Sequence, residues 1–505
     1  VSKFIGGGEN PDGTQKAKLS KLGGTDWFKA KSKAKKATKE MAKQLIALYA
    51  QRQRQPGYAF HSDDPWQREF EDKFPFQETD DQLRCVQEIK ADMERPVPMD
   101  RLLCGDVGYG KTEIALRAVM KCVLEGKQAA ILVPTTVLAN QHFQTATRRF
   151  QGFPVRICVL TRYQNSRNSK SILQDTAEGK VDILIGTHRL LQKSIQFKDL
   201  GLLVIDEEQR FGVTHKERLK ELAKQVDVLT LSATPIPRTL ALLLYGDLEV
   251  SIIDERPPGR QNVDTFLVGE ALRQRMYGFV RKQVQEGHQV YMVCPAVEEG
   301  QEDGQDLKAV TTYAQTLQTQ VFPDLRVGLL HGKMKGKDKE AVMAAFAAGD
   351  IDILCATTVI EVGVDVPRAT LMVIENAERF GLSQLHQLRG RVGRGDAKSY
   401  CVLVSSHQGK ETRQRLKALC ATNDGFQIAE EDLKLRGPGD FFGQRQHGLP
   451  QLQLADLVED VQVLQQAKEG AEWLLNDDPG LQKRENRGIL DHVRVQFEDN
   501  ENRLN

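Results

Sequence analysis

The sequence lacks the long apolar runs of a membrane protein, because none of its apolar stretches approaches the roughly 20 residues that a membrane span needs. It also lacks a signal-peptide pattern at its start. Its eight cysteines are scattered, without a Cys-x-x-Cys pair or metal-ligand spacing. Several of them, such as Cys294, Cys355 and Cys401, lie inside apolar runs, as reduced and buried thiols do. We therefore expect a cytoplasmic protein that has neither a membrane anchor nor a disulfide framework.

The sequence also lacks an excess of one charge, since it has 70 Lys and Arg and 69 Asp and Glu. This balance conceals a basic segment, because residues 1–54 carry thirteen Lys or Arg and only four Asp or Glu. Apolar residues recur there at helical spacing, which predicts a long basic helix within residues 27–54. Such a helix is either a solvated face or a contact surface for nucleic acid or a partner protein. The chain starts with Val rather than Met, so we expect a fragment of a longer protein.

Beyond about residue 100, short apolar runs rich in β-branched residues alternate with helical stretches, in two successive sets. The first set is AAILVP (129–134), VDILIGT (181–187), LGLLVIDEE (200–208) and VLTLSAT (228–234). After the break ERPPGRQ (255–261), the second set is QVYMVCPAV (289–297), IDILCATTVI (351–360), ATLMVIENA (369–377) and SYCVLV (399–404). Continuous apolar strands separated by helices predict parallel sheets that are covered on both faces. The sequence therefore predicts two α/β lobes with a cleft between them, followed by a mostly helical region after residue 420.

The stretch GDVGYGKT (105–112) has the pattern of a phosphate-binding loop, G-x-x-x-x-G-K-[ST]. An apolar run precedes it and a helical pattern follows, which disfavours the alternative of a chance glycine-rich turn. Glycines let backbone N–H groups turn inward, and the helix start adds partial positive charge. The stretch predicts ATP or GTP binding, with the lysine at the β- and γ-phosphates and the threonine at Mg²⁺. The contacts are assigned to Gly105, Gly108, Gly110, Lys111 and Thr112.

A second chemical motif is LLVIDEEQR (202–210), in which an apolar strand ends in carboxylates. Asp206 is placed to hold Mg²⁺, and Glu207 to orient or deprotonate the attacking water. Two acidic residues after a strand are, alone, weak support for a metal and hydrolysis site. The phosphate loop about a hundred residues earlier makes this assignment much stronger.

The second set of strands contributes QLHQLRGRVGRG (384–395), which places Arg391 and Arg394 three residues apart. Such arginines can reach across the cleft and stabilise the charge that develops on a γ-phosphate. The alternative is a solvated basic helix, which the three glycines in this stretch disfavour. A nucleotide held between two lobes would make lobe closure depend on its hydrolysis.

These motifs together resemble a known family over nearly the whole chain. GDVGYGKT, IGTHRL, DEEQ, SATPIPRT, ATTVIEVGVDVP and QLHQLRGRVGR are similar to the ordered motifs of the superfamily-two DNA helicases and translocases. The amino-terminal part, with FPFQETDDQLR and DEEQRFGVTHKERLK, resembles the bacterial transcription-repair coupling factors. From LALLLYGDLEVSIIDERPPGR onward, through HGKMKGKDKEAVMAAF, the chain looks more like the RecG helicases. The resemblance implies ATP rather than GTP, Mg²⁺, and double-stranded DNA as the track.

The resemblance also implies a fold class and domain limits. We expect two tandem RecA-like parallel-sheet lobes, flanked by an amino-terminal basic helix and a carboxyl-terminal helical hairpin with a translocation motif. The limits are a basic linker and relay helix at 1–65, an ATP-binding lobe at 66–262, a second lobe at 263–409, the translocation motif at 410–480 and a tail at 481–505.

Individual residues take roles from the resemblance where they match a family motif. Phe76 and Gln82 lie where the family contacts adenine, and Ser232 and Thr234 match the motif that links hydrolysis to DNA movement. Gln209 departs from the pattern, because both related families usually carry His there, so altered coupling is expected. The remaining positions that match segments along the DNA track or in the coupling motifs are Thr135, Thr187, His188, Thr357, Thr358, Glu361 and Gln387.

The stretch LRGPGDFFGQRQHG (435–448) matches the translocation motif of the two related families. The expected structure is a helical hairpin at about 410–432 followed by a tight loop that levers against the DNA. Arg436, Arg445 and Gln446 are expected to bond to the hairpin and to motor residues, and Phe441 and Phe442 to anchor the loop. The alternative is an incidental glycine-rich connector.

Three functions follow from these patterns. The first is an ATP-driven translocase, in the nucleoid-associated cytoplasm, that pushes stalled RNA polymerase forward, contacts the polymerase through segments upstream of Val1, and acts as a monomer. The second is a RecG-like helicase that remodels stalled forks and branched DNA. The third is a DNA-binding scaffold with an inactive ATPase, which the intact Lys111, Asp206, Glu207, Arg391 and Arg394 disfavour.

Overall fold

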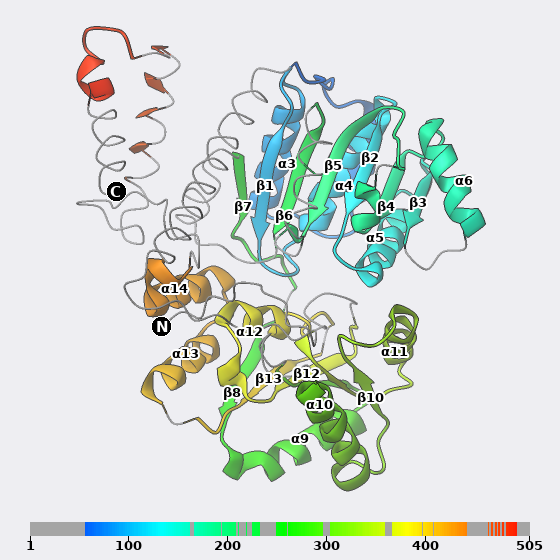
Figure 1. The fold of residues 1–505 in the computed structure, drawn as a ribbon, viewed down its shortest axis with the longest axis vertical. Coiled ribbons are helices and arrows are strands. Elements are labelled where there is room, and N and C mark those ends of the chain that lie inside the picture. The colour runs from blue at the N-terminus through cyan, green and yellow to red at the C-terminus, as the bar shows by residue number, and fades with distance from the viewer. Residues whose placement is uncertain are drawn as a thin grey trace, which may run out of the picture.

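Two α/β lobes lie one above the other along the long axis of the molecule (Figure 1). The structure is a computed structural model that describes residues 56–161, 166–192, 194–208, 211, 219, 225–232, 249–259, 261–295, 304–358, 366–395, 397–407, 409–441 and scattered positions between 463 and 491. Each lobe is built on one parallel sheet, which confirms the predicted fold class for the two lobes. The basic helix expected within residues 27–54 lies outside the described residues.

The sheet of the first lobe has seven strands. Their order is β3 (Ile157–Leu160), β4 (Ile183–Gly186), β2 (Gln128–Leu132), β5 (Leu200–Asp206), β6 (Asp227–Ser232), β1 (Asp100–Gly105) and β7 (Glu249–Ile253). Strand β2 shows why the runs are apolar throughout: Ala129 and Ile131 enter the core on one face of the sheet, and Ala130 and Leu132 enter the core on the other. A parallel sheet covered on both faces needs apolar residues at every position of its inner strands.

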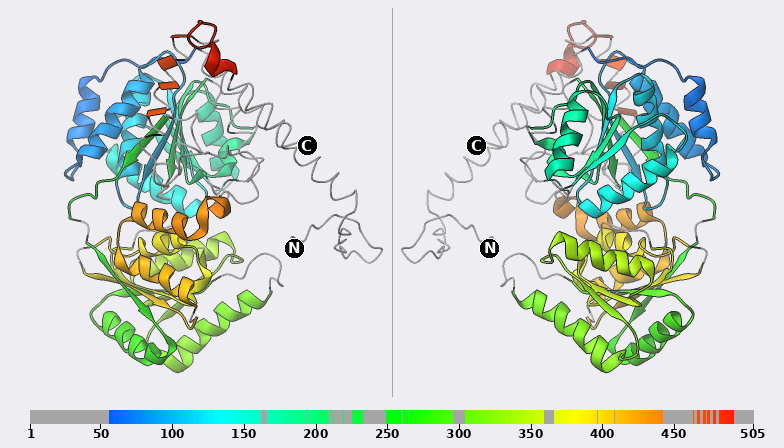
Figure 2. Two further views of the ribbon diagram at one scale, coloured as in Figure 1. Left: turned by 90° about the vertical axis from the view of Figure 1, so that its left-hand side faces the viewer. Right: turned by 90° about the vertical axis from the view of Figure 1, so that its right-hand side faces the viewer.

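Helices cover both faces of this sheet, as the side views show (Figure 2). They are α2 (Pro65–Asp72), α3 (Asp80–Met93), α4 (Lys111–Leu124), α5 (Thr136–Arg149), α6 (Ser166–Ala177) and the short η1 (His188–Leu191). Local sequence fixes where α3 begins, because Thr79 and Gln82 form a reciprocal capping box. The Asp64 side chain caps α2 by accepting a hydrogen bond from the N–H of Gln67, and Pro65 follows at the first helical position, where its missing N–H costs nothing.

The second lobe has a six-stranded parallel sheet. Its order is β10 (Val327–Leu330), β11 (Ile353–Ala356), β9 (Gln289–Val293), β12 (Ala369–Ile374), β13 (Ser399–Val404) and β8 (Val263–Val268). Around it lie α9 (Arg273–Gln285), α10 (Gly304–Thr316), α11 (Gly336–Ala348), α12 (Leu382–Arg389) and the short turns η3 (Glu270–Leu272), η4 (Leu317–Val321) and η6 (Ala377–Arg379). Met372 and Ile374 of β12 enter one core and Leu371 and Val373 the other, so this sheet is also covered on both faces.

Two further helices follow the second lobe and pack against α12: α13 (Lys410–Ala421) and α14 (Gly425–Phe441). The side chain of Asp424 accepts hydrogen bonds from the N–H groups of Phe426 and Gln427, which starts α14. The expectation that residues 435–448 form a loop is wrong for 435–441, which are helical. Pro438 therefore lies inside α14 rather than at its end, although a proline in a helix interior costs about 3 kcal/mol. Residues 442–448 lie outside the described part of the chain.

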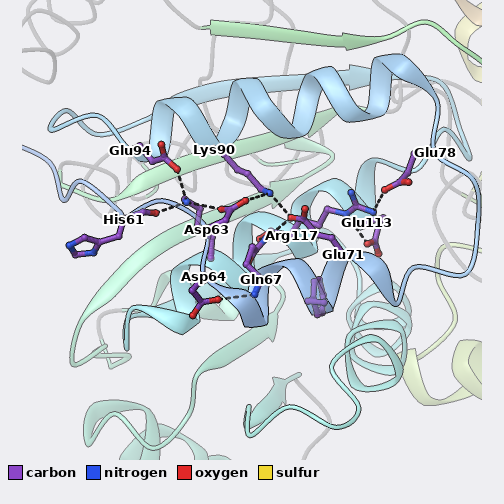
Figure 3. Close-up of polar contacts among 12 residues, drawn as sticks. His61, Asp63, Asp64, Gln67, Glu71, Glu78, Lys90, Glu94, Glu113 and Arg117 are labelled. Carbon is purple, nitrogen blue, oxygen red and sulfur yellow. Dashed lines mark hydrogen bonds and ion pairs between the residues drawn. The ribbon is translucent and has the colours of Figure 1, made fainter.

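A strap of residues 56–72 packs along α3 and α4 through buried charges (Figure 3). On α4, Lys121 donates to the main-chain oxygen of His61 at 2.6 Å and pairs with Asp63 at 3.0 Å. Lys90 of α3 also pairs with Asp63, at 2.6 Å. Burial acts to raise the pKa of the Asp63 carboxyl, but the hydrogen bonds from Lys90 and Lys121 outweigh it and hold that pKa below its usual range. The strap is thereby tied to the helix that begins at the phosphate loop.

The cysteine and membrane expectations can be checked on the described residues. All eight cysteines are free, and five of them are buried. Burial raises the pKa of the Cys401 thiol to about 12, which leaves it protonated and unreactive at neutral pH. Within the described ranges, no helix is both long and apolar enough to span a membrane.

Candidate functional site

The phosphate loop joins the carboxyl end of β1 to the start of α4, as its motif predicts. Gly108 and Gly110 have φ angles of 78° and 85°, in the left-handed region that side chains rarely adopt. Gly110 also lies against the side chain of Gln82, where any Cβ atom would collide with Nε2. Gly110 is the N-cap residue of α4, so the loop leads directly into the amino terminus of this 14-residue helix. A helix amino terminus is a favourable place for an anion such as phosphate.

Lys111 is buried at this loop and holds its backbone. Its Nζ donates to the main-chain oxygens of Gly105 at 2.6 Å and Asp106 at 2.7 Å. Burial lowers the pKa of Lys111, and the carboxylates of Asp106, Asp206 and Glu207 act against that shift. Three negative groups thus surround one cation beside a helix amino terminus. This arrangement suits a phosphate that is bridged by a divalent metal ion.

The two predicted carboxylates lie where β5 ends. Asp206 is the last residue of the strand, and its Oδ2 lies 3.0 Å from Nε2 of His142 on α5. The contact with His142 orients the carboxylate and leaves acceptor sites on it for a metal ion. A carboxylate oxygen and the hydroxyl of Thr112 are hard ligands that suit Mg²⁺, so these residues fit the predicted metal role.

Glu207 has an unusual backbone for its residue type, with a φ of 55°. Its N–H donates to the carbonyl of Leu231 on the neighbouring strand β6, at 3.1 Å. A non-glycine residue in the left-handed region costs about 1–3 kcal/mol, and such strain concentrates at functional sites. Side chains of a β-strand point alternately to the two faces of the sheet. The left-handed backbone of Glu207, directly after β5, ends this alternation at Glu207.

Of the two expected adenine-binding residues, Gln82 contacts the loop directly. Gln82 is buried, and its Nε2 donates to the main-chain oxygen of Tyr109 at 2.9 Å while its Oε1 accepts from the N–H of Thr79 at 3.1 Å. The side chain of Gln82 thus connects the start of α3 to the phosphate loop. Phe76 is 71% exposed and contacts the ring of Phe74 edge-on. Its exposed face is available for stacking on a base.

The second lobe meets the phosphate loop through α12. Nε2 of His386 lies 2.6 Å from Oδ1 of Asp106, and both side chains are buried. Arg391 and Arg394 follow the end of this helix and are half-buried; Nε of Arg394 donates to the carbonyl of Gly390 at 3.2 Å. The structure therefore brings the predicted arginine motif of one lobe to the predicted phosphate loop of the other.

Other predicted positions lie at the ends of strands, in the first turns of helices or, for Gln387, in the second half of α12. Thr135 caps α5, since its hydroxyl accepts from the N–H of Leu138 at 3.2 Å. The remaining described positions are buried Thr187, Ser232, Thr357 and Gln387, half-buried Thr358 and exposed His188. The predicted residues that lie outside the described chain are Gln209, Thr234, Glu361, Arg445 and Gln446, together with the side chain of Arg436.

Sequence reasoning missed three polar residues that contact the site. Asp106 and His386 lie inside motifs that were identified, but no role was assigned to either. His142 lies six residues after the start of α5, on no recognised motif. The local sequence gave no signal for the contact of His386 with the phosphate loop, because its partner Asp106 is 280 residues away.

Comparison with known proteins accounts for this arrangement. A family model described as DEAD/DEAH box helicase matches residues 79–243, and a model described as helicase conserved C-terminal domain matches residues 270–396. The chain carries the two domains of a superfamily-two helicase. A third model, described as the C-terminal part of domain 3 of ATP-dependent DNA helicase RecG, matches residues 422–499 of this helicase.

Two groups of relatives match this helicase about equally well. It is 47% identical over 438 residues to the ATP-dependent DNA helicase RecG of Synechocystis sp., covering 87% of this chain and 52% of the relative. It is 44% identical over 458 residues to the transcription-repair-coupling factor of Bacillus subtilis, covering 89% of this chain and 37% of the relative. The chain thus spans about half, or less, of the length of these relatives. The resemblance to both families is confirmed.

Solved structures agree with this assignment. The structure of RecG bound to a three-way DNA junction matches with a TM-score of 0.69 and 42% identity, covering 84% of this chain and 56% of that one. A structure of Mss116p bound to single-stranded RNA and a nucleotide analogue matches with a TM-score of 0.55 at 17% identity, covering 71% of this chain and 76% of that one. The second likeness shows the fold alone.

The geometry of Gly110 leads to a first testable expectation. Gly110→Ala should abolish binding of a fluorescent ATP analogue, because the new methyl group collides with Gln82 at the phosphate loop. It should also destabilise the fold by more than the roughly 1–2 kcal/mol of left-handed strain. Gly126→Ala is the matched control, since Gly126 has a φ of 73° but open space around it. Equal effects of the two substitutions on binding and thermal unfolding would refute this account of the loop.

Proposed function

We propose that this chain is an ATP-dependent double-stranded DNA translocase. The observation that carries the proposal is the direct contact between the phosphate loop of one lobe and the arginine-bearing end of α12 in the other. A nucleotide at this junction contacts both lobes, so its hydrolysis changes how the lobes lie relative to each other. Cyclic opening and closing of two lobes on a DNA track is the physical basis of movement.

The residues divide the chemistry of hydrolysis among themselves. Lys111 and the loop N–H groups bind the phosphates, and Gln82 and Phe76 contact the adenine. Mg²⁺ held by Thr112 and Asp206 would neutralise charge on the β- and γ-phosphates. Glu207 orients and deprotonates the attacking water, while Arg391 and Arg394 stabilise charge on the γ-phosphate. The strained backbone at Glu207 is consistent with a side chain held in position for one task.

Double-stranded DNA is the proposed track. A translocase grips phosphates rather than base edges, so binding depends strongly on salt and weakly on sequence. Thr135, Thr187, His188, Thr357, Thr358 and Glu361 are assigned to the track, while Ser232, Thr234, Gln209, Gln387, Arg436, Arg445 and Gln446 couple it to hydrolysis. The RecG relative bound to a three-way DNA junction supports the assignment of DNA as the polymer.

For the cellular task, we favour displacement of stalled RNA polymerase; the relatives named transcription-repair-coupling factor support a task that links transcription to repair. In that role the motor acts as a monomer in the cytoplasm. A second candidate is remodelling of stalled forks and other branched DNA. The match of residues 422–499 to the RecG model favours this alternative.

ATP turnover by three variants tests the proposed chemistry. Lys111→Ala should abolish hydrolysis and ATP binding, because the cation at the phosphates is lost. Glu207→Gln should bind ATP normally but hydrolyse it about 10²–10⁴-fold more slowly, as expected when a general base is removed. Glu208→Gln is the control, because it removes the adjacent carboxylate, to which no role is assigned. Phosphate release should be measured with and without linear duplex DNA.

Near-wild-type turnover by Glu207→Gln would show that the general-base assignment is wrong. A wild-type protein that binds duplex DNA but hydrolyses no ATP would support the scaffold alternative instead.

A side-by-side assay separates the two cellular tasks. The protein should displace RNA polymerase halted on linear duplex DNA by nucleotide starvation, because a motor that moves along duplex pushes whatever stands in its path. It should unwind a synthetic three-way junction no faster than it displaces a triplex-forming strand from linear duplex. Junction unwinding without polymerase displacement would favour the fork-remodelling role.

A further inference from the structure

The contact between α12 and the phosphate loop is a buried hydrogen bond between the two lobes. Oδ1 of Asp106 lies 2.6 Å from Nε2 of His386 and also accepts from the N–H of Val107 at 2.6 Å. Asp106 is 3% exposed and His386 4% exposed. Figure 1 shows α12 on the side of its lobe that faces the other lobe. The carboxylate of Asp106 thus fixes the backbone of the phosphate loop and the position of a helix from the second lobe at once.

The protonation of the His386 ring follows from its other neighbour. Nη2 of Arg389 lies 2.9 Å from Nδ1 of His386, and a guanidinium group can only donate. Nδ1 must therefore accept, which assigns the ring proton to Nε2. Nε2–H then donates to the Asp106 carboxylate, which can only accept when ionised. Arg389 thus determines the tautomer of His386 in which Nε2 carries the proton and can donate to the phosphate loop.

Arg389 itself is anchored at the end of α13. Its Nη1 donates to the main-chain oxygens of Leu419 and Thr422, both at 2.8 Å. These carbonyls lie at the carboxyl end of that helix, where the helix dipole favours a cation. The guanidinium is buried, and burial lowers the pKa of Arg389. The anchor fixes the last turn of α12 in its own lobe, independently of the contact with Asp106.

A second point of contact lies one helical turn after His386. A Cβ atom built on Gly390 would stand 3.1 Å from Cβ of Val107, closer than a relaxed contact allows. Residues four apart lie on the same face of a helix, so His386 and Gly390 face the loop together. Arg391 comes directly after this close approach, and Arg394 donates to the Gly390 carbonyl. The position of both arginines therefore depends on how α12 docks on the loop.

We propose that His386 is a positioning residue that docks the arginine-bearing end of α12 on the phosphate loop through its Nε2–H and the Asp106 carboxylate. While this bond is made, Arg391 and Arg394 are held toward the γ-phosphate. When it is broken, ATP still binds to the first lobe but the arginines are no longer aligned. The inference rests on the proposed ATPase function and adds a residue to which that function assigned no role.

Two amide substitutions test the roles of Nε2 and Nδ1 of His386 separately. In His386→Gln the amide nitrogen can take the place of Nε2 and keep the donor to Asp106. In His386→Asn the shorter side chain reproduces only the Nδ1 end and loses that donor. We expect His386→Asn to lower kcat for ATP about tenfold or more while KM changes less than about threefold, because alignment rather than nucleotide binding is lost. We expect His386→Gln to restore kcat to within about threefold of the wild type.

A glycine substitution tests the same docking without changing any polar group. Gly390 has a φ of −67°, which alanine adopts freely, so Gly390→Ala only pushes α12 away from Val107. It should lower kcat like His386→Asn. Gly278→Ala in α9 is the control, because nothing lies within 4 Å of its new methyl group. Thermal unfolding should show whether each variant remains folded; if His386→Asn is unfolded, Gly390→Ala decides the question.

The outcomes distinguish this inference from the proposed function. A wild-type protein without ATP turnover would overturn both. If the wild type hydrolyses ATP, a kcat at the wild-type level in folded His386→Asn or Gly390→Ala would overturn the positioning role alone. The role would also fail if His386→Gln lost as much activity as His386→Asn, because the donor to Asp106 would then not matter.

Discussion

The site depends on one constraint, which is the backbone conformation of the loop between β1 and α4. Two glycines allow the left-handed turns, and groups from three helices hold the result. Lys111 of α4 and Gln82 of α3 bond to main-chain carbonyls of the loop, while His386 of α12 bonds to the Asp106 side chain. Two of these helices belong to the first lobe and one to the second. The loop is thus the point where the two lobes and the nucleotide chemistry meet.

Parallel sheets explain why chemically active residues from distant parts of the sequence gather here. The carboxyl ends of parallel strands share one edge of a sheet, so β1, β5 and β6 deliver the phosphate loop, Asp206 and Ser232 to the same edge. The apolar strands fix these positions because both faces of each sheet are buried. At the far end of the same unit, Lys121 of α4 is neutralised by Asp63 of the strap and by Glu94 at the end of α3.

Local patterns were sufficient to predict the two lobes, the phosphate loop and the carboxylates at the end of β5, because each depends on residues that are close in sequence. Partners of these residues could not be predicted in the same way. His142 is 64 residues from Asp206, and His386 is 280 residues from Asp106, so only the fold brings them together. The helix through Pro438 was missed because Gly437, Pro438 and Gly439 all disfavour a helix interior, so the local sequence predicts a break there.

Hydrogen exchange tests most directly the claim that one nucleotide site is built from both lobes. Backbone amides should be followed with and without Mg²⁺ and a nonhydrolysable ATP analogue. The account predicts that amides of residues 107–112 and of residues 386–394 become protected together at the same nucleotide concentration. Protection confined to 107–112, with exchange in 386–394 unchanged at saturating nucleotide, would contradict it.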